Sequence, residues 1–394
     1  MKRILFILFV AILAACAPAP TATPVPPTAT QVPPTATRPA PTATQVPTLA
    51  PTATTAPTIA PTATRPPATA TQVAAAATAS PAPTFAPNAI CANQDTLESL
   101  IACIVAKMPR RDTQGYAVPP ANVLADFKQV AAQMLAGKCD DLALPASLAK
   151  IYSVAIFKDK QNNSGYCAAL EILDENANGT IDRGWGTFIV NPNATRELSI
   201  QAPHPLADIA TDAQAISVFK AVSARSYILA GSHRDANTKK STCSNVNEGE
   251  ADATHNAGMF FQSAVEAAAD FYKTKEWHAI QFHGMAATTC PNVDAFLSYG
   301  VQLAPKPGDK ILELRANILK QQPKWAVTVF GETPPCNLYA TENVSGRLLN
   351  GVPSDQVCTL PATNYSGKFI HIEQKIALRS ATADWSAAIS ATWK

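Results

Sequence analysis

A long tract rich in proline, threonine and alanine divides the sequence and limits which residues can form a folded core. Between Ala17 and Asn88 these residue types dominate, and Pro-Thr-Ala-Thr recurs at 27–30, 34–37, 41–44, 51–54 and 61–64. The tract has no hydrophobic periodicity, so it offers no face that could pack against a core. Its composition is typical of a semi-extended tether of polyproline character. We therefore predict a disordered tether over 17–88 and one globular domain over 89–394.

Residues 1–16 have the features of a bacterial lipoprotein signal peptide. A basic tip is followed by an apolar run from Ile4 to Ala15, and Cys16 comes directly after Leu-Ala-Ala. The apolar run is too short to span a membrane. Its ending favours lipidation of Cys16 over cleavage as an ordinary signal peptide. We therefore predict an extracytoplasmic protein, at the cell surface or in the periplasm, that contacts the membrane only through a lipid anchor.

The remaining cysteines all lie in the predicted domain, at positions 91, 103, 139, 167, 243, 290, 336 and 358. An even number in an exported domain predicts four disulfides and an oxidising compartment. No pair has the spacing of a zinc ribbon, so we expect no cysteine metal site. The pairing stays open. Sequential pairing is the simplest possibility, and Cys243 and Cys290 could join two loops of the site described below.

Hydrophobic patterning predicts an α/β domain. A capping box at Asp95-Thr-Leu-Glu98 opens a helix to Met108, and a second helix spans 120–135, so 89–140 is expected to form a helical N-terminal cap. Strands and helices then alternate, which favours a three-layer α/β/α fold with a mixed, largely parallel, twisted sheet braced by disulfides. Strands are predicted at 151–157, 168–173, 186–190, 196–201, 226–230, 279–282, 325–330 and 368–372, and helices at 212–222, 255–273, 292–299, 308–320 and 384–391.

The turn at 174–182 has two interpretations. Asp174, Asn176, Asn178 and Asp182 occupy oxygen-ligand places of a calcium loop, with Gly179 at the sixth place. The twelfth place lacks the glutamate that such a loop needs. Asn-Gly between two strands also signals a hairpin, which we favour.

Several functional classes are disfavoured by what the sequence lacks. Net charge is +2 without a basic block, so nucleic acid is not an expected partner. There is no Gly-x-Ser-x-Gly, Walker or Gly-x-Gly-x-x-Gly motif, which argues against serine hydrolases and nucleotide cofactors. A small molecule or a peptide remains the expected ligand. The oligomeric state is not predicted.

Chemically active side chains follow four of the predicted strands. They are His204 and Asp208 after 196–201, Arg234 and Asn237 after 226–230, His283 after 279–282, and Glu373 after 368–372. In sheets of this kind, ligands bind at the carboxyl ends of the strands. Neutral imidazoles with a carboxylate bind Zn²⁺ and can leave a position open for water and substrate. The sequence therefore predicts a zinc site at this edge of the sheet.

Three segments resemble the zinc carboxypeptidases and their amidohydrolase relatives, the poly-gamma-glutamate hydrolases and N-formylglutamate amidohydrolases. Pro203-His204-x-x-x-Asp208-x-x-Thr211 resembles their first ligand loop, and Ile280-Gln-Phe-His283-Gly284 the strand end with the third ligand. Phe369-Ile-His-Ile-Glu373 resembles the late strand with the catalytic glutamate. The resemblance covers about 196–380. Asp replaces the family's Glu at a longer spacing, so Asp212 remains an alternative ligand to Asp208.

The resemblance implies an enzyme that hydrolyses amide bonds, at a peptide C-terminus or in an N-acyl amino acid. The implied metal ligands are His204, Asp208 and His283, with Glu373 as general base. Arg234 would stabilise the oxyanion or clamp a carboxylate. Substrate binding is predicted for Asn237, His255 and Arg379, and His255 is also a possible replacement ligand.

Each role has a structural alternative. Asp208 and Asp212 could cap the following helix, and Glu373 could be a solvated acid paired with Lys375 or Arg379. His278 and His371 lie within predicted strands and are expected to be structural. At the level of the whole protein, the alternatives are a non-enzymatic lipoprotein that binds peptides or cell-wall fragments on the same fold, and a metal-dependent esterase or phosphoesterase.

Overall fold

The computed structural model describes residues 84–172, 178–243 and 248–394. The predicted signal, Cys16 and the tract up to residue 83 lie outside the described residues. Within the described ranges, no helix is both long and apolar enough to cross a membrane. Residues just before position 89 already contact the domain, because Phe85 packs against its core and the Ala86 N–H donates to Ser153 Oγ at 2.8 Å.

A nine-stranded mixed sheet forms the centre of the domain, in the order β1-β2-β3-β5-β4-β6-β9-β7-β8. Its central strands β5, β4, β6 and β9 run parallel, so their carboxyl ends meet at one edge of the sheet. The outer pairings are antiparallel except β7 with β8. The strands are β1 Tyr152–Asp159, β2 Ser164–Glu171, β3 Thr187–Val190, β4 Arg196–Ala202, β5 Ala224–Leu229, β6 His278–Gly284, β7 Ala295–Ser298, β8 Val327–Val329 and β9 Phe369–Gln374.

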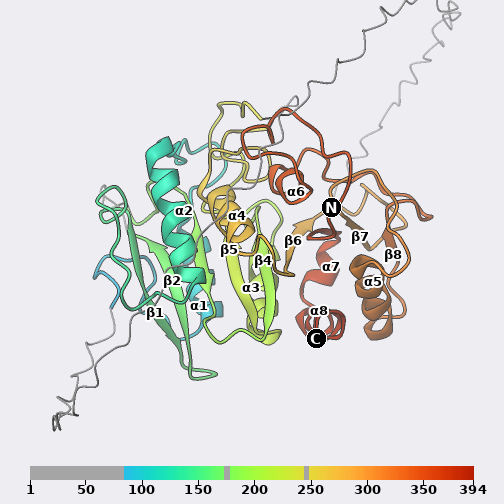
Figure 1. Ribbon diagram of the computed structural model, residues 1–394, viewed down its shortest axis with the longest axis horizontal. Coiled ribbons are helices and arrows are strands. Elements are labelled where there is room, and N and C mark those ends of the chain that lie inside the picture. Colours follow the sequence, from blue (N-terminus) through green and yellow to red (C-terminus); the bar gives the residue numbers. More distant parts are fainter. Residues whose placement is uncertain (1–83, 173–177, 244–247) are drawn as a thin grey trace, which may run out of the picture. The chain divides into compact units, whose positions relative to one another are not determined.

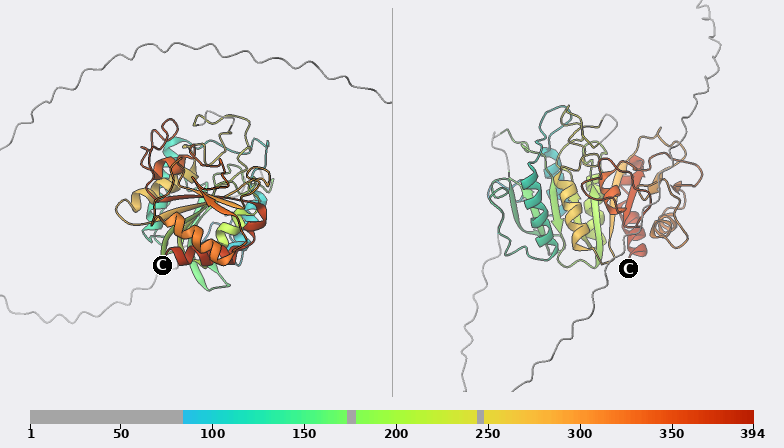
Figure 2. Two further views of the ribbon diagram at one scale, coloured as in Figure 1. Left: turned by 90° about the vertical axis from the view of Figure 1, so that its right-hand side faces the viewer. Right: turned by 45° about the horizontal axis from the view of Figure 1, so that its top comes forward.

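Helices cover both faces of this sheet and confirm the predicted three-layer α/β/α fold (Figure 1). One face carries α1 Leu97–Lys107, α3 Thr211–Ala221, α5 Lys310–Gln321 and α8 Thr382–Thr392. The other carries α2 Ala121–Leu135, α4 Phe260–Phe271 and α6 Val344–Leu349, and α7 is the short Ile376–Arg379. In the right-hand view of Figure 2, α2 and α4 lie side by side in front of the sheet.

The helices predicted within 89–140 lie on opposite faces of the sheet. α1 buries Leu97, Leu100, Ile101 and Ile104 at helical spacing and packs against α3, whereas α2 packs against α4. The Thr96 side chain caps α1 by accepting a hydrogen bond from the Ser99 N–H. Each helix therefore contributes to a different outer layer, and each layer has its own hydrophobic core.

Two sequence predictions were wrong. Residues 292–299 were predicted as helix, but Ala295–Ser298 forms β7, because β9 and β8 offer strand partners on both sides. Cys243 and Cys290 do not pair with each other. The disulfides are Cys91–Cys103, Cys139–Cys167, Cys243–Cys358 and Cys290–Cys336, so only the first two are sequential. All eight domain cysteines are thus paired, as expected of an oxidising compartment.

The segment around 174–182 is only partly described. β2 and β3 pair antiparallel, as the hairpin interpretation requires. Residues 173–177, which include two of the possible calcium ligands, lie outside the described residues.

Candidate metal centre

His204 and Asp208 leave the carboxyl end of β4 together on one turn of backbone. The Asp208 N–H donates to the His204 carbonyl at 2.8 Å, and this helix-like spacing places both side chains on the same side. His204 Nδ1 lies 3.3 Å from Asp208 Oδ2. Both residues are buried, at 2% and 5% exposure. Asp208 therefore does not act as a solvent-facing helix cap.

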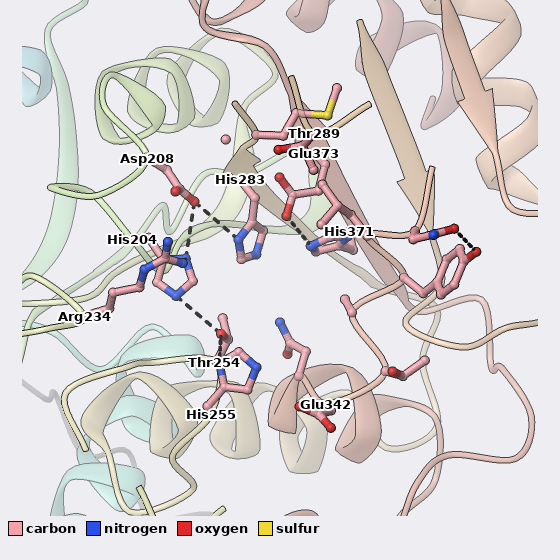
Figure 3. A pocket seen from close by; sticks show the side chains of 18 of the residues that line it. His204, Asp208, Arg234, Thr254, His255, His283, Thr289, Glu342, His371 and Glu373 are labelled. Atoms are coloured by element: carbon pink, nitrogen blue, oxygen red, sulfur yellow. Dashed lines mark hydrogen bonds and ion pairs between the residues drawn. The ribbon is translucent and has the colours of Figure 1, made fainter. Parts of the chain in front are cut away.

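His283, near the end of β6, completes the group. Its Nδ1 lies 3.5 Å from Asp208 Oδ2, and all three side chains offer ligand atoms within 4.8 Å of one another. Two ligands of a tetrahedral zinc ion, each about 2.1 Å from it, are roughly 3.4 Å apart. Figure 3 shows the three side chains turned toward one another. Two imidazoles and one carboxylate beside an open cavity fit a catalytic zinc site.

Buried acids and imidazoles set the charges of this group. Burial lowers the pKa of His204, but Asp252 and Asp208 outweigh it and raise that pKa to about 9. Burial raises the pKa of Asp208, but the hydrogen bond from protonated His204 holds it well below its ordinary value. Burial and the nearby His371 lower the pKa of His283 to about 4. Without a metal, the group is therefore an ion pair beside a neutral imidazole. A bound cation would replace the proton of His204.

Asp252 is a buried partner of His204 that the sequence analysis missed. Its Oδ1 lies 3.1 Å from His204 Nε2, and it accepts hydrogen bonds from the Thr254 N–H at 2.9 Å and from Thr254 Oγ1 at 2.8 Å. His204 presents its other nitrogen, Nδ1, to Asp208. A carboxylate behind a ligand imidazole fixes its orientation and makes it more basic. The dense polar run from Asp252 to His255 was the only sequence signal for this role.

His371 and Glu373 face the cavity from β9. They are two residues apart, so their side chains lie on the same face of the strand. His371 Nε2 lies 3.4 Å from Glu373 Oε1, and Glu373 is in register with His283. His371 was predicted to be structural, yet its ring lies 4.5 Å from that of His283 and lines the cavity. Together with His283 these two residues form a second group of potential ligands.

A cavity of about 500 Å³ opens beside these groups. Arg234, from the loop after β5, lines it with Nη1 3.5 Å from His204 Nδ1, and His255 lines it from the loop before α4. The opposite wall is the segment 337–343, which includes Glu342 and Asn343. Figure 3 shows the two metal-ligand groups on one side of this cavity and His255 and Glu342 on the other.

Asn237, the alternative ligand Asp212 and Lys375, a possible partner of Glu373, do not line the cavity. Asn237 uses its amide on Tyr116 and Glu250, donating to the Tyr116 carbonyl at 2.7 Å. Asp212 lies in the first turn of α3, apart from the ligand groups, so Asp208 is the acid placed beside the histidines. Lys375 pairs with Asp294 rather than with Glu373.

Arg379 is buried behind the cavity. It donates to the carbonyl oxygens of Ile209 at 2.7 Å and Gln374 at 3.1 Å. A Cβ on Gly284 would lie 2.1 Å from Arg379 Nη2, so a larger residue there would require the guanidinium to move. Arg379 therefore joins the loop after β4 to the ends of β6 and β9, and it is not placed to contact a ligand in the cavity.

Comparisons with known proteins give little beyond this geometry. No protein-family model matches the sequence, and no curated protein matches it significantly. A metallo-carboxypeptidase from Burkholderia cenocepacia aligns over 70% of this chain and 69% of its own, with 12% identity and a TM-score of 0.27. A gene product of Agrobacterium tumefaciens aligns over 50% of this chain and 85% of its own, with 9% identity and a TM-score of 0.30. Such low scores support no functional conclusion.

Proposed function

We propose that this domain is a zinc-dependent hydrolase of amide bonds, acting on a peptide C-terminus or an N-acyl amino acid. The observation that carries the proposal is the convergence of His204, Asp208 and His283, with Glu373 facing the same cavity. His204, Asp208 and His283 would hold the ion. When bound, zinc would supply Lewis-acid activation of a water molecule and of the scissile carbonyl.

The roles of the surrounding side chains follow from their positions. Glu373 would accept a proton from the attacking water as the new C–O bond forms, and would deliver it to the nitrogen as the C–N bond breaks. His371 Nε2 lies 3.4 Å from the Glu373 carboxylate and would orient that carboxylate. Arg234 would clamp a substrate carboxylate or donate hydrogen bonds to the carbonyl oxygen as negative charge develops there. Asp252 would keep His204 in the ligand orientation.

The decisive variant is Glu373→Gln, which removes the base but keeps the size and polarity of the side chain. We expect the purified protein to retain stoichiometric zinc while hydrolysis of a panel of N-acyl amino acids and peptides falls at least about 100-fold. Glu276→Gln is the matched control, because Glu276 is exposed, precedes β6 by two residues and does not line the cavity. Its zinc content and activity should equal those of the unmodified protein.

Other outcomes would point elsewhere. Loss of zinc from Glu373→Gln would make Glu373 a ligand through the second group and not a base. Absence of stoichiometric zinc, with no effect of Glu373→Gln on any amide substrate, would favour a non-enzymatic binding protein. Cleavage of esters or phosphoesters alone would replace the amide proposal with another hydrolase class.

We also propose that the domain is held at the cell surface by lipid on Cys16 and by the 17–88 tract as a spacer. The proposal is supported by the signal-like sequence and by the four disulfides, which fit an extracytoplasmic location. A Cys16→Ser variant should leave the membrane fraction when cells are fractionated. Continued membrane association of that variant would count against lipid anchoring.

A further inference from the structure

Glu342 is an acid in the cavity with which no described side chain forms a hydrogen bond or an ion pair. The other acids that line the cavity have imidazole partners, Asp208 in His204 and His283, and Glu373 in His371. Glu342 is half-buried, and within the described ranges its carboxylate makes neither a hydrogen bond nor an ion pair. A carboxylate can only accept hydrogen bonds. Its natural complement is therefore a cationic donor on a ligand.

The backbone around Glu342 is fixed, so the carboxylate is held at the cavity wall. The Thr341 carbonyl accepts from Arg347 Nε at 2.9 Å. Asn343 caps α6 by accepting from the Gly346 N–H at 2.9 Å, and the Val344 N–H donates to the Thr254 carbonyl at 2.9 Å.

The charge of Arg347 acts on Glu342, but in the part of the chain that the structure describes the two side chains form no ion pair. Its guanidinium is buried and donates to the carbonyl oxygens of Thr341 and Val357, the latter at 2.8 Å. These contacts direct its donors at backbone oxygens. The Glu342 carboxylate is left for the cavity.

Arg234 supplies the opposite charge on another wall of the same cavity. Among the described residues Arg234 has no acidic partner, and its Nη1 lies 3.5 Å from His204 Nδ1. In the view of Figure 3, His255 lies between Arg234 and Glu342. A ligand with separate negative and positive groups could therefore meet a complementary charge at each end.

We infer that the cavity recognises a zwitterionic amino-acid derivative, with its carboxylate toward Arg234 and a side-chain ammonium group at Glu342. This inference rests on the proposed function, and it specifies the substrate as an amide with a basic side chain, such as that of lysine. Glu342 is then a specificity-determining residue that contacts the substrate and takes no part in the proton transfers.

Binding without turnover gives the cleanest test. Calorimetry on the purified full-length mature protein carrying Glu373→Gln, in which hydrolysis should be at least about 100-fold slower, would compare Nα-acetyl-lysine with Nα-acetyl-norleucine, which has a similar chain but lacks the ammonium. The further variants are made in the same background. We expect the lysine derivative to bind about 10-fold more tightly, as for a charge-assisted hydrogen bond at a half-exposed site. Glu342→Gln should abolish this preference, and Glu342→Lys should reverse it toward Nα-acetyl-glutamate.

The matched control is Asp355→Asn, because Asp355 is exposed on the same long segment and does not line the cavity. It should keep the preference for lysine, and circular dichroism should show that every variant is folded. Equal affinity for both acetyl derivatives, no binding of acetyl-lysine at millimolar concentration, or a preference that survives Glu342→Gln would each overturn the inference. If the preference depends on Glu342 but no amide is cleaved, Glu342 recognition stands and the hydrolase proposal fails. If amides are cleaved equally well whatever the charge of the substrate side chain, the hydrolase proposal stands and recognition by Glu342 fails.

Discussion

His204 contacts a different carboxylate at each ring nitrogen, with Asp252 3.1 Å from Nε2 and Asp208 3.3 Å from Nδ1. Because Asp252 is buried and already accepts from Thr254, it is held as an acceptor behind the ring. Nδ1 is thereby directed at the cavity, where Asp208 and His283 provide the remaining ligand atoms. One residue of the polar loop before α4 thus determines which nitrogen could bind a metal.

Glu171 is a buried acid far from this chemistry, at the end of β2. Its Oε2 accepts the N–H groups of Trp185 at 3.1 Å and Gly186 at 3.3 Å. Burial outweighs these hydrogen bonds and raises its pKa from 4.5 to about 7. The folded protein therefore binds a proton here that the unfolded chain releases above pH 4.5. The free energy of unfolding should fall as pH rises from about 4.5 to 7, and the loss should be complete above that range.

Glu171→Gln should remove this pH-dependent loss, because an amide oxygen still accepts both N–H groups and never ionises. We expect the variant to be more stable than the unmodified protein by about 2–3 kcal/mol at pH 8.5, and equal to it at pH 4. Urea unfolding at both pH values measures the difference. Glu276→Gln, at an exposed position, should show no such trend. A constant difference at the two pH values would contradict a buried, protonated Glu171.

At the scale of elements, the sequence contained enough to place the main site residues together. Chemically active side chains lie at or just after the carboxyl ends of β4, β5, β6 and β9, and parallel strands bring such ends to one edge. His204, Asp208, Arg234, His283 and Glu373 accordingly lie around one cavity. Their roles remain proposals, but their proximity follows from strand order and from which end of each strand they occupy.

Other parts of the site could not be predicted, because they depend on tertiary contacts that leave no local pattern in the sequence. Asp252 lies in a loop without periodicity, and its partner is 48 positions away in the sequence. The assignment of His371 as structural overlooked strand alternation, which places it on the same face as Glu373. The strand β7 was predicted as helix because its short apolar run fits either state until its neighbours are known.

A buried amide network joins the strands beneath the cavity. Gln281 Oε1 accepts from His283 Nε2 at 3.1 Å and from Asn343 Nδ2 at 2.8 Å, while Gln281 Nε2 donates to Gln201 at 2.8 Å. Such groups are costly to bury unless they are paired. The network therefore fixes the ring of His283 with Nδ1 toward Asp208, and it connects β4 and β6 to the cavity wall that carries Glu342.

At the scale of the whole domain, the cavity is assembled from distant segments that two disulfides hold together. Cys243–Cys358 joins the loop after β5 to the segment between β8 and β9, and Cys290–Cys336 joins the loop after β6 to the same segment. That segment supplies the wall at 337–343. Neither link follows from the order of cysteines in the sequence, because each depends on which loops meet above the sheet.

The same long-range assembly predicts that zinc will stabilise the fold. His204 and Asp208 follow β4 whereas His283 belongs to β6, so the unfolded chain does not hold the three ligands together. Free zinc at about 100 times its dissociation constant should therefore stabilise the domain by about 2.7 kcal/mol, which raises the melting temperature by several degrees. Calorimetry after EDTA treatment, with and without added zinc and without reductant, measures this shift.

Asp208→Asn should greatly reduce the zinc-induced rise in melting temperature, and Glu276→Gln should retain it. An undiminished shift in Asp208→Asn would place the zinc elsewhere, with the group of His283, His371 and Glu373 as the next candidate.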